Sequence, residues 1–290
     1  MTPQSDVVLI RQARPEDASV AGDICYRAFS TINAAHSFPC DFPAPEAAVG
    51  LLQMLFAHPA FYCVVAEAGG RVVGSNCLDE RSAIRGLGPI TVEPGAQNRG
   101  TGRMLMQAVL DRARERQAAG VRLLQAGFHM RSMSLYASLG FDIREPIVCL
   151  QGKTRDRAVA GCSVRRAQSA DADTCNSLAR RVHGYDRAQE LADAVQHGTA
   201  AVVERGGRIT GYATNLAFFG HGVAESNQDL EALMVSVESF GGPGLLLPSR
   251  NSELFQWALS QGLKLVQPLT LMTLGLYNEP KGAWFPSILM

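Results

Sequence analysis

The strongest constraint on the fold of this chain is a weak internal repeat, because a repeat requires the same structural unit to form twice. VVAEAGGRVVG at Val64–Gly74 matches AVVERGGRITG at Ala201–Gly211. Two further pairs of segments align in the same order: Arg122–Ile147 with Gly244–Leu269, and Ile10–Ala18 with Val164–Ala172. Since three blocks recur in one order, duplication of a fold explains them better than chance similarity does.

The repeated blocks predict the same local structures in both halves. A Gly-Gly pair between two apolar runs predicts a β-hairpin. Gly140 and Gly262 stand at matching places, where a short helix ends on a left-handed residue before a strand. The first half also predicts a meander of strands at Tyr62–Glu67, Arg71–Leu78 and Arg85–Val92. The fold class expected for each half is therefore α+β, a mixed and mostly antiparallel sheet flanked by helices.

The seam between the halves is expected in the polar stretch KTRDRAVAG, which begins at Lys153. We expect a first domain over residues 1–152, a linker over 153–160 and a second domain over 161–290. Each domain then has an ordinary size for a single hydrophobic core.

Composition restricts the classes of partner. The 290 residues contain 27 Lys and Arg and 27 Asp and Glu, so the formal net charge is zero. Nucleic-acid and membrane surfaces usually select an excess of basic residues, and we expect neither as a partner. The start of the chain lacks a signal-peptide pattern, no apolar run is long enough to span a membrane, and the seven cysteines are widely spaced. These features predict a cytoplasmic protein with reduced thiols and no metal site.

The stretch TVEPGAQNRGTGRM, from Thr91 to Met104, joins an apolar run to a helical pattern and is typical of a phosphate-binding turn. A P-loop does not fit, because Thr101 stands where the lysine is required. A dinucleotide fingerprint does not fit either, because Leu105 replaces its third glycine. What fits is a cradle of main-chain N–H groups at the start of a helix near Gly100, which holds a pyrophosphate without a side-chain anchor.

The pattern V-x-P-x-x-Q-x-x-G-x-G at Val92–Gly102 resembles the acetyl-CoA motif of the GCN5-related N-acetyltransferases, the GNAT family. A second family element follows, in which Tyr136, Gly140 and Phe141 match the usual N-x-x-A-x-x-x-Y-x-x-x-G-F. His129 replaces the common Asn, and Ser132 replaces the common Ala. The resemblance covers residues of about 8–150 and implies two tandem acyl-CoA N-acyltransferase-like domains.

The resemblance also implies the cosubstrate and its contacts. Acetyl-CoA is expected, with its pantetheine arm along Ile90, Thr91 and Val92. The remaining cofactor contacts are expected from Gln97, Asn98, Arg99, Gly100, Thr101, Gly102, Arg103, His129 and Ser132. The implied reaction is direct attack on the thioester by a primary amine, which belongs to a small or amino-acid-like molecule. Tyr136 matches the general acid, since a phenol and a thiol have similar pKa values.

The general base and the acceptor site are less defined by the sequence. Many relatives carry a Glu in the fourth strand, but AIRGLGPITV contains none. The candidate bases are therefore Glu93 at the strand end, or Glu80 and its neighbour Asp79 acting through water, and the alternative is that these are solvated surface charges. The first helix and the loop after it supply substrate candidates, namely Phe29, His36, Phe38 and Asp41. A monomer and a homodimer both remain open.

The second half lacks this machinery. No Q-x-x-G-x-G occurs before DLEALM, where Ser226 or Asn227 is typical of an ordinary N-cap. Ala258 occupies the position that corresponds to Tyr136. We therefore expect a degenerate second domain and one cofactor site in each chain. The alternative readings are a non-catalytic acyl-CoA sensor and a tandem-domain interaction protein.

Overall fold

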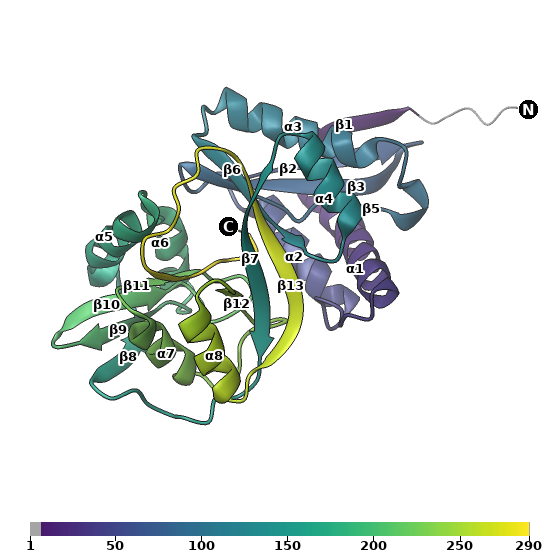
Figure 1. Ribbon diagram of the computed structural model, residues 1–290. Coiled ribbons are helices and arrows are strands. Elements are labelled where there is room, and N and C mark those ends of the chain that lie inside the picture. The colour runs from purple at the N-terminus through teal and green to yellow at the C-terminus, as the bar shows by residue number, and fades with distance from the viewer. Residues whose placement is uncertain (1–6, 290) are drawn as a thin grey trace, which may run out of the picture. The chain divides into compact units, whose positions relative to one another are not determined.

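The computed structural model describes residues 7–289, which divide into two compact units (Figure 1). Unit 1 contains residues 7–80 and 84–121 together with Leu289, and unit 2 contains Arg81–Ala83 and Arg122–Ile288. The division therefore passes through strand β6 (Gly120–Ala126). The linker expected over residues 153–160 separates the two sequence repeats, whereas the compact units divide within β6. The expected linker therefore stays a prediction.

Unit 1 is an antiparallel sheet with helices on both faces. Strands β1 (Val8–Gln12), β2 (Phe61–Ala68), β3 (Arg71–Asp79) and β4 (Ile84–Leu87) follow one another across the sheet, and β5 (Thr91–Val92) also pairs with β3. Helices α1 (Ala18–Ala35) and α2 (Pro45–Ala57) pack together on one face, and α3 (Thr101–Glu115) covers the other (Figure 1). Short 3-10 turns at Pro15–Asp17 and Pro94–Ala96 precede α1 and α3.

The strand predicted at Arg85–Val92 is wrong in one respect, because it is interrupted between β4 and β5. Leu87 pairs with Leu78, whereas Thr91 pairs with Ser75, so the segment between them carries one residue more than β3 does. The irregular segment contains Pro89, which has no N–H to donate to a ladder. The result is a β-bulge at residues 88–90, directly before the glycine turn.

Unit 2 contains two sheets. The first has the order β6, β13 (Lys264–Gly275), β7 (Asp142–Gln151), β12 (Leu245–Pro248), with the short helices α4 (Met130–Ser138) and α8 (Ser252–Ser260). The second has the order β14 (Ala283–Phe285), β11 (Gly222–Ala224), β10 (Arg208–Ala213), β9 (Ala201–Arg205), β8 (Cys162–Arg166). Helices α5 (Ala172–His183) and α7 (Asn227–Val235) pack on this second sheet, and α6 (Ala188–Gln196) packs on α5.

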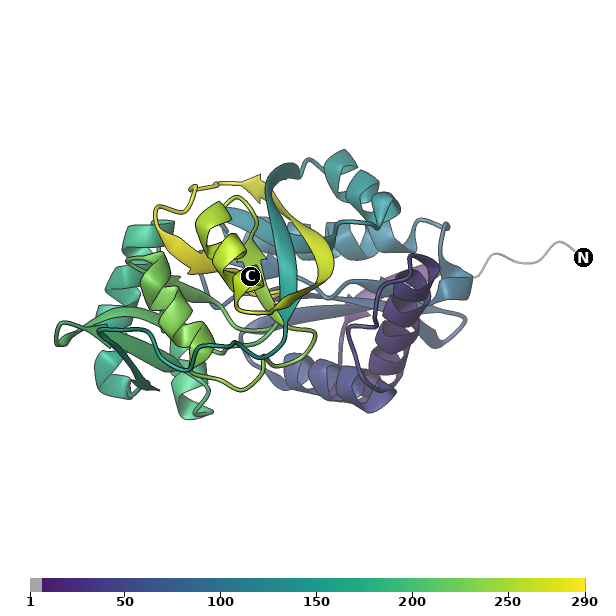
Figure 2. The ribbon, with the colours of Figure 1, turned by 60° about the horizontal axis from the view of Figure 1, so that its bottom comes forward.

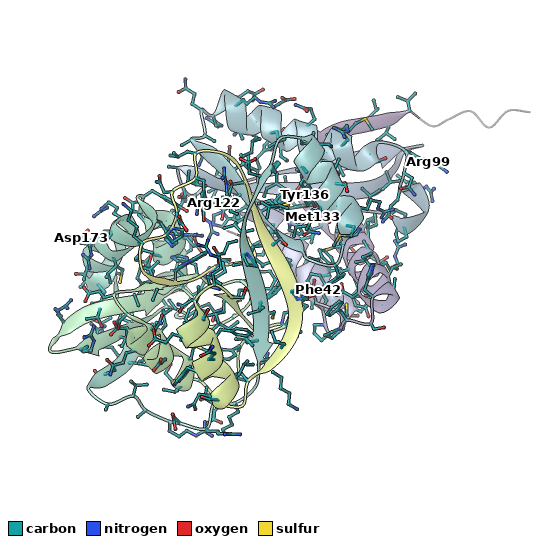
Figure 3. The ribbon with its side chains drawn as sticks, in the orientation of Figure 1. Phe42, Arg99, Arg122, Met133, Tyr136 and Asp173 are labelled. Carbon is teal, nitrogen blue, oxygen red and sulfur yellow. The ribbon has the colours of Figure 1, made fainter. Side chains whose placement is uncertain are left out.

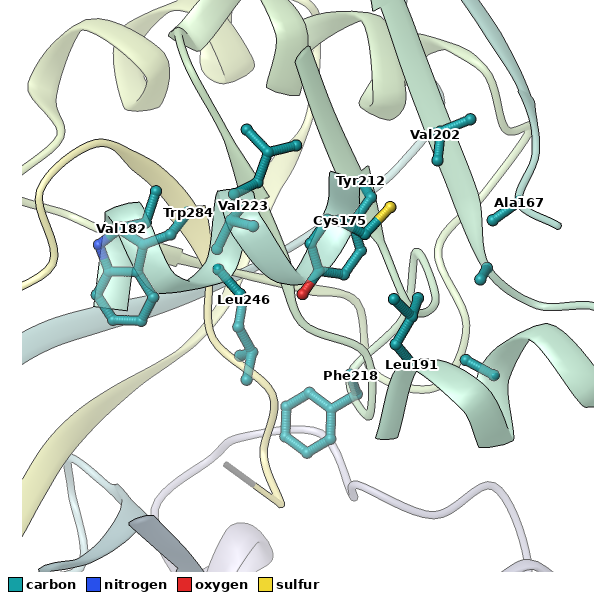
Figure 4. Close-up of a cluster of buried hydrophobic side chains, with 14 of the residues drawn as sticks. Ala167, Cys175, Val182, Leu191, Val202, Tyr212, Phe218, Val223, Leu246 and Trp284 are labelled. Atoms are coloured by element: carbon teal, nitrogen blue, oxygen red, sulfur yellow. The ribbon is translucent and has the colours of Figure 1, made fainter. Parts of the chain in front are cut away.

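The core of unit 2 is built from side chains that both sheets and α5 contribute. Figure 4 shows one cluster of them, in which Tyr212 and Val223 of the second sheet lie near Cys175 and Val182 of α5. Leu246 of the first sheet belongs to the same cluster. Burial of these apolar side chains is the main contribution to the stability of the unit.

The predicted repeat is confirmed by matching side-chain contacts at the front of each half. In unit 1, Arg11 donates to the two carboxylate oxygens of Asp17 at 2.7 and 2.9 Å and to Glu67 at 2.8 Å. In unit 2, Arg165 donates to Asp171 and Glu204 at the same three distances. The glycines that end α4 and α8, Gly140 and Gly262, have φ angles of 92° and 93°. Each half therefore forms the same fold.

The two halves exchange their last strands within unit 2. In the repeat, β6 corresponds to β12 and β7 corresponds to β13, so the order β6-β13-β7-β12 reads the same from either end. Equivalent positions Ile147 and Leu269 pair with each other. The N–H of Gly127 donates to Pro268 at 2.9 Å, and that of Ser249 donates to Pro146 at 3.0 Å. Figures 1 and 2 both show β13 beside β7 along its length. Strands of the two halves thus alternate within this one sheet.

All seven cysteines are free, and five of them are buried. Within residues 7–289, no helix combines the length and the apolar character that a membrane span requires.

Candidate functional site

The glycine turn joins β5 to α3 in unit 1, and its main chain is shaped by two left-handed residues. Asn98 has a φ of 65°, and Gly100, the N-cap of α3, has a φ of 83°. The side-chain amide of Gln97 donates to the carbonyl of Val92 at 3.1 Å and so fixes the start of the turn. Gly100 provides no side-chain cap, and the first N–H groups of α3 keep their capacity to bind an anion.

The side chains around this turn suit a main-chain cradle. Arg99 and Arg103 are exposed, and Arg99 extends from the turn in Figure 3. Thr101 is buried at the start of α3, and Gly102 follows it without a side chain. The donor set is therefore N–H groups with two guanidinium groups nearby, which fits a pyrophosphate.

The corresponding helix of the second half is closed to an anion. Ser226 caps α7 by accepting a hydrogen bond from the N–H of Asp229 at 3.4 Å, which confirms it as an ordinary N-cap. The carboxylate of Asp229 is buried at this helix start and accepts from Thr210 at 2.6 Å and from Arg205 at 3.0 Å. A negative side chain already occupies the positive end of α7. Of the two equivalent turns, the one before α3 is the one that suits a phosphate.

The residues expected to contact pantetheine lie in and just before the strand that precedes the turn. Thr91 and Val92 pair with Ser75 and Gly74 of β3, whereas Ile90 lies in the bulge. Gly74 allows this close pairing, because a Cβ at that position would lie 2.6 Å from the carbonyl oxygen of Thr91. A side chain there would displace β5 and the turn that follows it.

Both carboxylates expected as bases are engaged by arginines in unit 1. Glu93 forms an ion pair with Arg27 of α1, and this carboxylate raises the pKa of Arg27. Glu80 accepts from Nε and Nη2 of Arg112, each at 3.1 Å. Asp79, its neighbour, is buried. Each glutamate therefore has a structural role beside its predicted chemical one.

The expected substrate loop is anchored to the end of α1. Asn33 donates to the carbonyl of Pro39 at 2.8 Å, and the ring of Phe29 packs edge-on against Phe42 at 5.8 Å between centroids. His36 is exposed, and its Nδ1 lies 3.0 Å from the carbonyl oxygen of Ile32. Phe38 and Asp41 are partly exposed in the same loop.

The second expected cofactor element lies in unit 2, at α4. Gln125 of β6 donates to the carbonyl of His129 at 2.8 Å and to the hydroxyl of Ser132 at 3.1 Å. Ser132 also donates to the carbonyl of His129, at 2.9 Å, which fixes the first turn of the helix. Tyr136, one turn beyond Met133 in Figure 3, is buried, and burial raises its pKa. Burial keeps the phenol protonated at neutral pH, but a raised pKa also makes it a weaker acid toward a thiolate, so the general-acid role of Tyr136 stays a prediction.

Sequence reasoning missed two charged residues in the strands of unit 2. Glu145 of β7 is buried and accepts from Arg250 at 3.1 Å, and burial raises the pKa of Glu145. Arg122 of β6 is 1% exposed. Neither belongs to a motif, so the available signal was a charge inside a stretch predicted to be a buried strand. The described residues contain no group of three or more His, Cys, Asp or Glu that is placed to hold a metal ion.

Residues 29–141 match the sequence model of the acetyltransferase (GNAT) family. A search of curated proteins found no match.

Three solved structures resemble the chain over nearly its whole length. A putative acetyltransferase from Pyrococcus horikoshii has a TM-score of 0.75 at 19% identity, covering 100% of this chain and 96% of that one. A GCN5-related N-acetyltransferase from Sphaerobacter thermophilus has a TM-score of 0.59 at 16% identity, covering 94% and 96%. A tandem GNAT protein from the clavulanic acid biosynthesis pathway has a TM-score of 0.55 at 16% identity, covering 94% and 100%. At these identities the likeness shows the fold, including its tandem form.

Proposed function

We propose, from the membership of residues 29–141 in the GNAT acetyltransferase family, that the chain transfers an acetyl group from acetyl-CoA to a primary amine. The family as a whole transfers acyl groups from acyl-CoA to amines. The finer part of the proposal is that the acyl group is acetyl and that the acceptor is a small or amino-acid-like molecule, whose amine attacks the thioester directly.

The observation that carries the proposal is the open turn before α3. Gly100 leaves the first N–H groups of that helix without a side-chain cap, whereas Ser226 and Asp229 close the equivalent helix of the second half. An uncapped helix start preceded by a strand is suited to the pyrophosphate of coenzyme A. One cosubstrate site in each chain follows from this difference.

The chain's own residues supply the remaining chemistry. Acetyl-CoA provides the activated thioester carbonyl. Main-chain groups of Ile90–Val92 align the pantetheine arm as an added strand, and an N–H from this segment faces the developing oxyanion. Tyr136, which matches the general acid of the family motif, is protonated at neutral pH and would donate its proton to the departing thiolate.

Substitution of Tyr136 by Phe tests the catalytic role and separates an enzyme from an acyl-CoA sensor. We expect the rate of thiol release with a good amine acceptor to fall by about 10²- to 10⁴-fold, because a positioned proton donor contributes that much. Calorimetry with acetyl-CoA should give an unchanged affinity. An unchanged rate would remove Tyr136 as the acid, and binding of acetyl-CoA without transfer to any amine would favour the sensor.

Substitution of Gly102 by Val tests the turn. The new side chain stands at the helix start and blocks the approach of phosphate to the main chain, so acetyl-CoA affinity should be lost. Retained affinity would refute the main-chain cradle.

A further inference from the structure

Strand β11 of unit 2 is the counterpart of β5, the strand along which the pantetheine arm is expected in unit 1. Gly211 of β10 and Gly74 of β3 occupy the same place in the sequence repeat. Gly211 pairs with Ala224 of β11, as Gly74 pairs with Val92 of β5. Both glycines are required by the same close approach, since a Cβ on either would lie within about 3 Å of atoms of the paired strand.

The free edges of the two strands also correspond. The N–H of Glu225, directly after β11, donates to the carbonyl of β10 residue Thr210 at 2.9 Å, and the N–H of Glu93, directly after β5, donates to β3 at 2.8 Å. The N–H groups of a strand point alternately to its two sides. Those of Gly222 and Ala224 therefore point away from β10, as the N–H of the matching residue in β5 points away from β3.

This edge of β11 is occupied by the C-terminal strand of the chain. Strand β14 pairs antiparallel with β11, and Ala283, Trp284 and Phe285 lie opposite Ala224, Val223 and Gly222. Strand β14 also contacts β12, which corresponds to β6 in the repeat. Among the strands of residues 7–289, β5 pairs with β3 alone, so the first half has no strand in the equivalent place.

Strand β14 is an interior strand of unit 2. Figure 4 shows Trp284 in one core cluster together with Val223 and Leu246, and the next residue, Phe285, belongs to the other core cluster. Both aromatic side chains are buried. Burial of these rings holds the strand in place without a covalent constraint beyond the chain itself.

We propose that β14 takes, in the second half, the place that the pantetheine arm takes in the first, so that the chain's own C-terminal strand closes a second pantetheine site. The proposal rests on the place given to the pantetheine arm in the proposed function. The amide groups of pantetheine pair with a strand edge as a peptide strand does, so one edge suits either occupant. Because Asp229 already occupies the start of α7, this second site suits pantetheine without its phosphates.

The test empties this site after the full chain has folded. A recognition sequence for a site-specific protease is inserted after Glu279, which is exposed in the loop before β14. The folded chain is cleaved, and the C-terminal fragment is removed in dilute urea by gel filtration. Amide hydrogen exchange of Gly222 and Ala224, resolved by NMR, should then accelerate by at least about tenfold, and the added fragment should restore the original rates. Val223 is the internal control, because its N–H points to β10 and should change less.

Pantetheine is the probe of the emptied site. At millimolar concentration it should slow the exchange of Gly222 and Ala224 by at least about tenfold in the emptied chain, and it should leave both unchanged in the uncut chain. The matched control is 2-mercaptoethanol, which has the thiol but no amide and should slow neither. Coenzyme A should protect less than pantetheine, because Asp229 repels its pyrophosphate.

The exchange of Val92 in the same spectra reports the site in unit 1, which separates the two proposals. Protection of Val92 without protection of Ala224 in the emptied chain would overturn the inference and leave the proposed function standing. Protection of Ala224 alone would support the inference and count against the cosubstrate site in unit 1, and protection of neither would overturn both. If the emptied chain unfolds, release of a labelled fragment from the cleaved chain decides: pantetheine should release at least about ten times more of it than 2-mercaptoethanol does, and equal release would overturn the inference.

Discussion

The buried ion pair of Arg187 and Glu190 makes the stability of unit 2 sensitive to a single substitution. Arg187 is 3% exposed and Glu190 is 7% exposed, and Nε of Arg187 donates to Glu190 Oε2 at 2.7 Å. Glu190 Oε1 lies 2.9 Å from His221, whose Nε2 lies 3.0 Å from the hydroxyl of Tyr212. Arg187→Met would leave the carboxylate buried with the imidazole as its remaining partner.

We expect Arg187→Met to lower the free energy of unfolding by about 3–5 kcal/mol at pH 7, the cost of breaking a buried pair on one side. This corresponds to a fall of roughly 6–20 °C in the unfolding midpoint for a unit of this size. The double variant Arg187→Met/Glu190→Leu should recover to within about 1 kcal/mol of the wild type, since both desolvation penalties disappear together.

The effect should depend on pH in a defined direction. Burial alone would raise the pKa of Glu190, but Arg187 and His221 hold that pKa well below its usual range. The pKa of a glutamate in the unfolded chain is near 4.3. Because the pKa of Glu190 is lower than this in the folded chain, its ionised form stabilises the fold above about pH 4.3, and this stabilisation is lost as the pH falls further. The difference between the wild type and Arg187→Met should therefore be largest above about pH 5 and should narrow below about pH 4.

Tryptophan fluorescence during urea unfolding is the appropriate assay, because Trp257 and Trp284 both lie in unit 2 and are the chain's two tryptophans. Arg181→Met is the control: its ion pair with Glu225 is exposed, and its loss should change stability by less than about 1 kcal/mol. A loss below about 1 kcal/mol in Arg187→Met at pH 7, or a difference that widens at low pH, would refute this reasoning.

Two further outcomes concern unit 1. Gly74→Val should weaken acetyl-CoA binding in calorimetry by at least about tenfold, because the new Cβ would lie 2.6 Å from the carbonyl oxygen of Thr91 and displace β5. The control variant Gly50→Ala, at a position with open space, should bind acetyl-CoA with the wild-type affinity. Equal affinities of the two variants would contradict the role of β5. Arg11 lowers the pKa of Asp17, so their ion pair stabilises the folded chain above about pH 4 and this stabilisation is lost below it. In urea titrations, Asp17→Asn should have a lower free energy of unfolding than the wild type at pH 7 and should lose less of it on acidification. If the wild type and the variant change in parallel with pH, the ion pair does not contribute as argued.

Local structure could be predicted from the sequence wherever all the residues that determine it lie within one short segment. The Gly-Gly hairpins, the left-handed glycines after α4 and α8 and the N-cap at Ser226 all depend on neighbours in the chain, and all were confirmed. Arg11 pairs with Asp17 as Arg165 pairs with Asp171, and in each case both partners lie within one short repeated segment of the sequence. The roles given to Tyr136 and to the glycine turn stay predictions.

What the sequence did not predict depends on partners far apart in the chain. The pattern of β7 indicates a buried strand, but an apolar alternation specifies a face and not a neighbour, so the insertion of β13 beside β7 was not predicted. The surroundings of Arg122 come from residues 183–190 and from Tyr277, which no spacing rule connects to β6. The bulge after Leu87 was missed because one added residue changes register without changing hydrophobicity.

The strand exchange in unit 2 has a consequence for biosynthesis. Strand β7 pairs with β12 on one edge and with β13 on the other, and both partners lie much later in the chain. During translation at about 5–20 residues per second, the roughly 100 residues that separate β7 from them take on the order of 5–20 s to be made. For that time both edges of the nascent strand lack their native partners and are open to pairing with other chains. A ribosome-bound chain that stops before residue 245 should therefore depend on chaperones, and the separate expression of the first half should give aggregated protein.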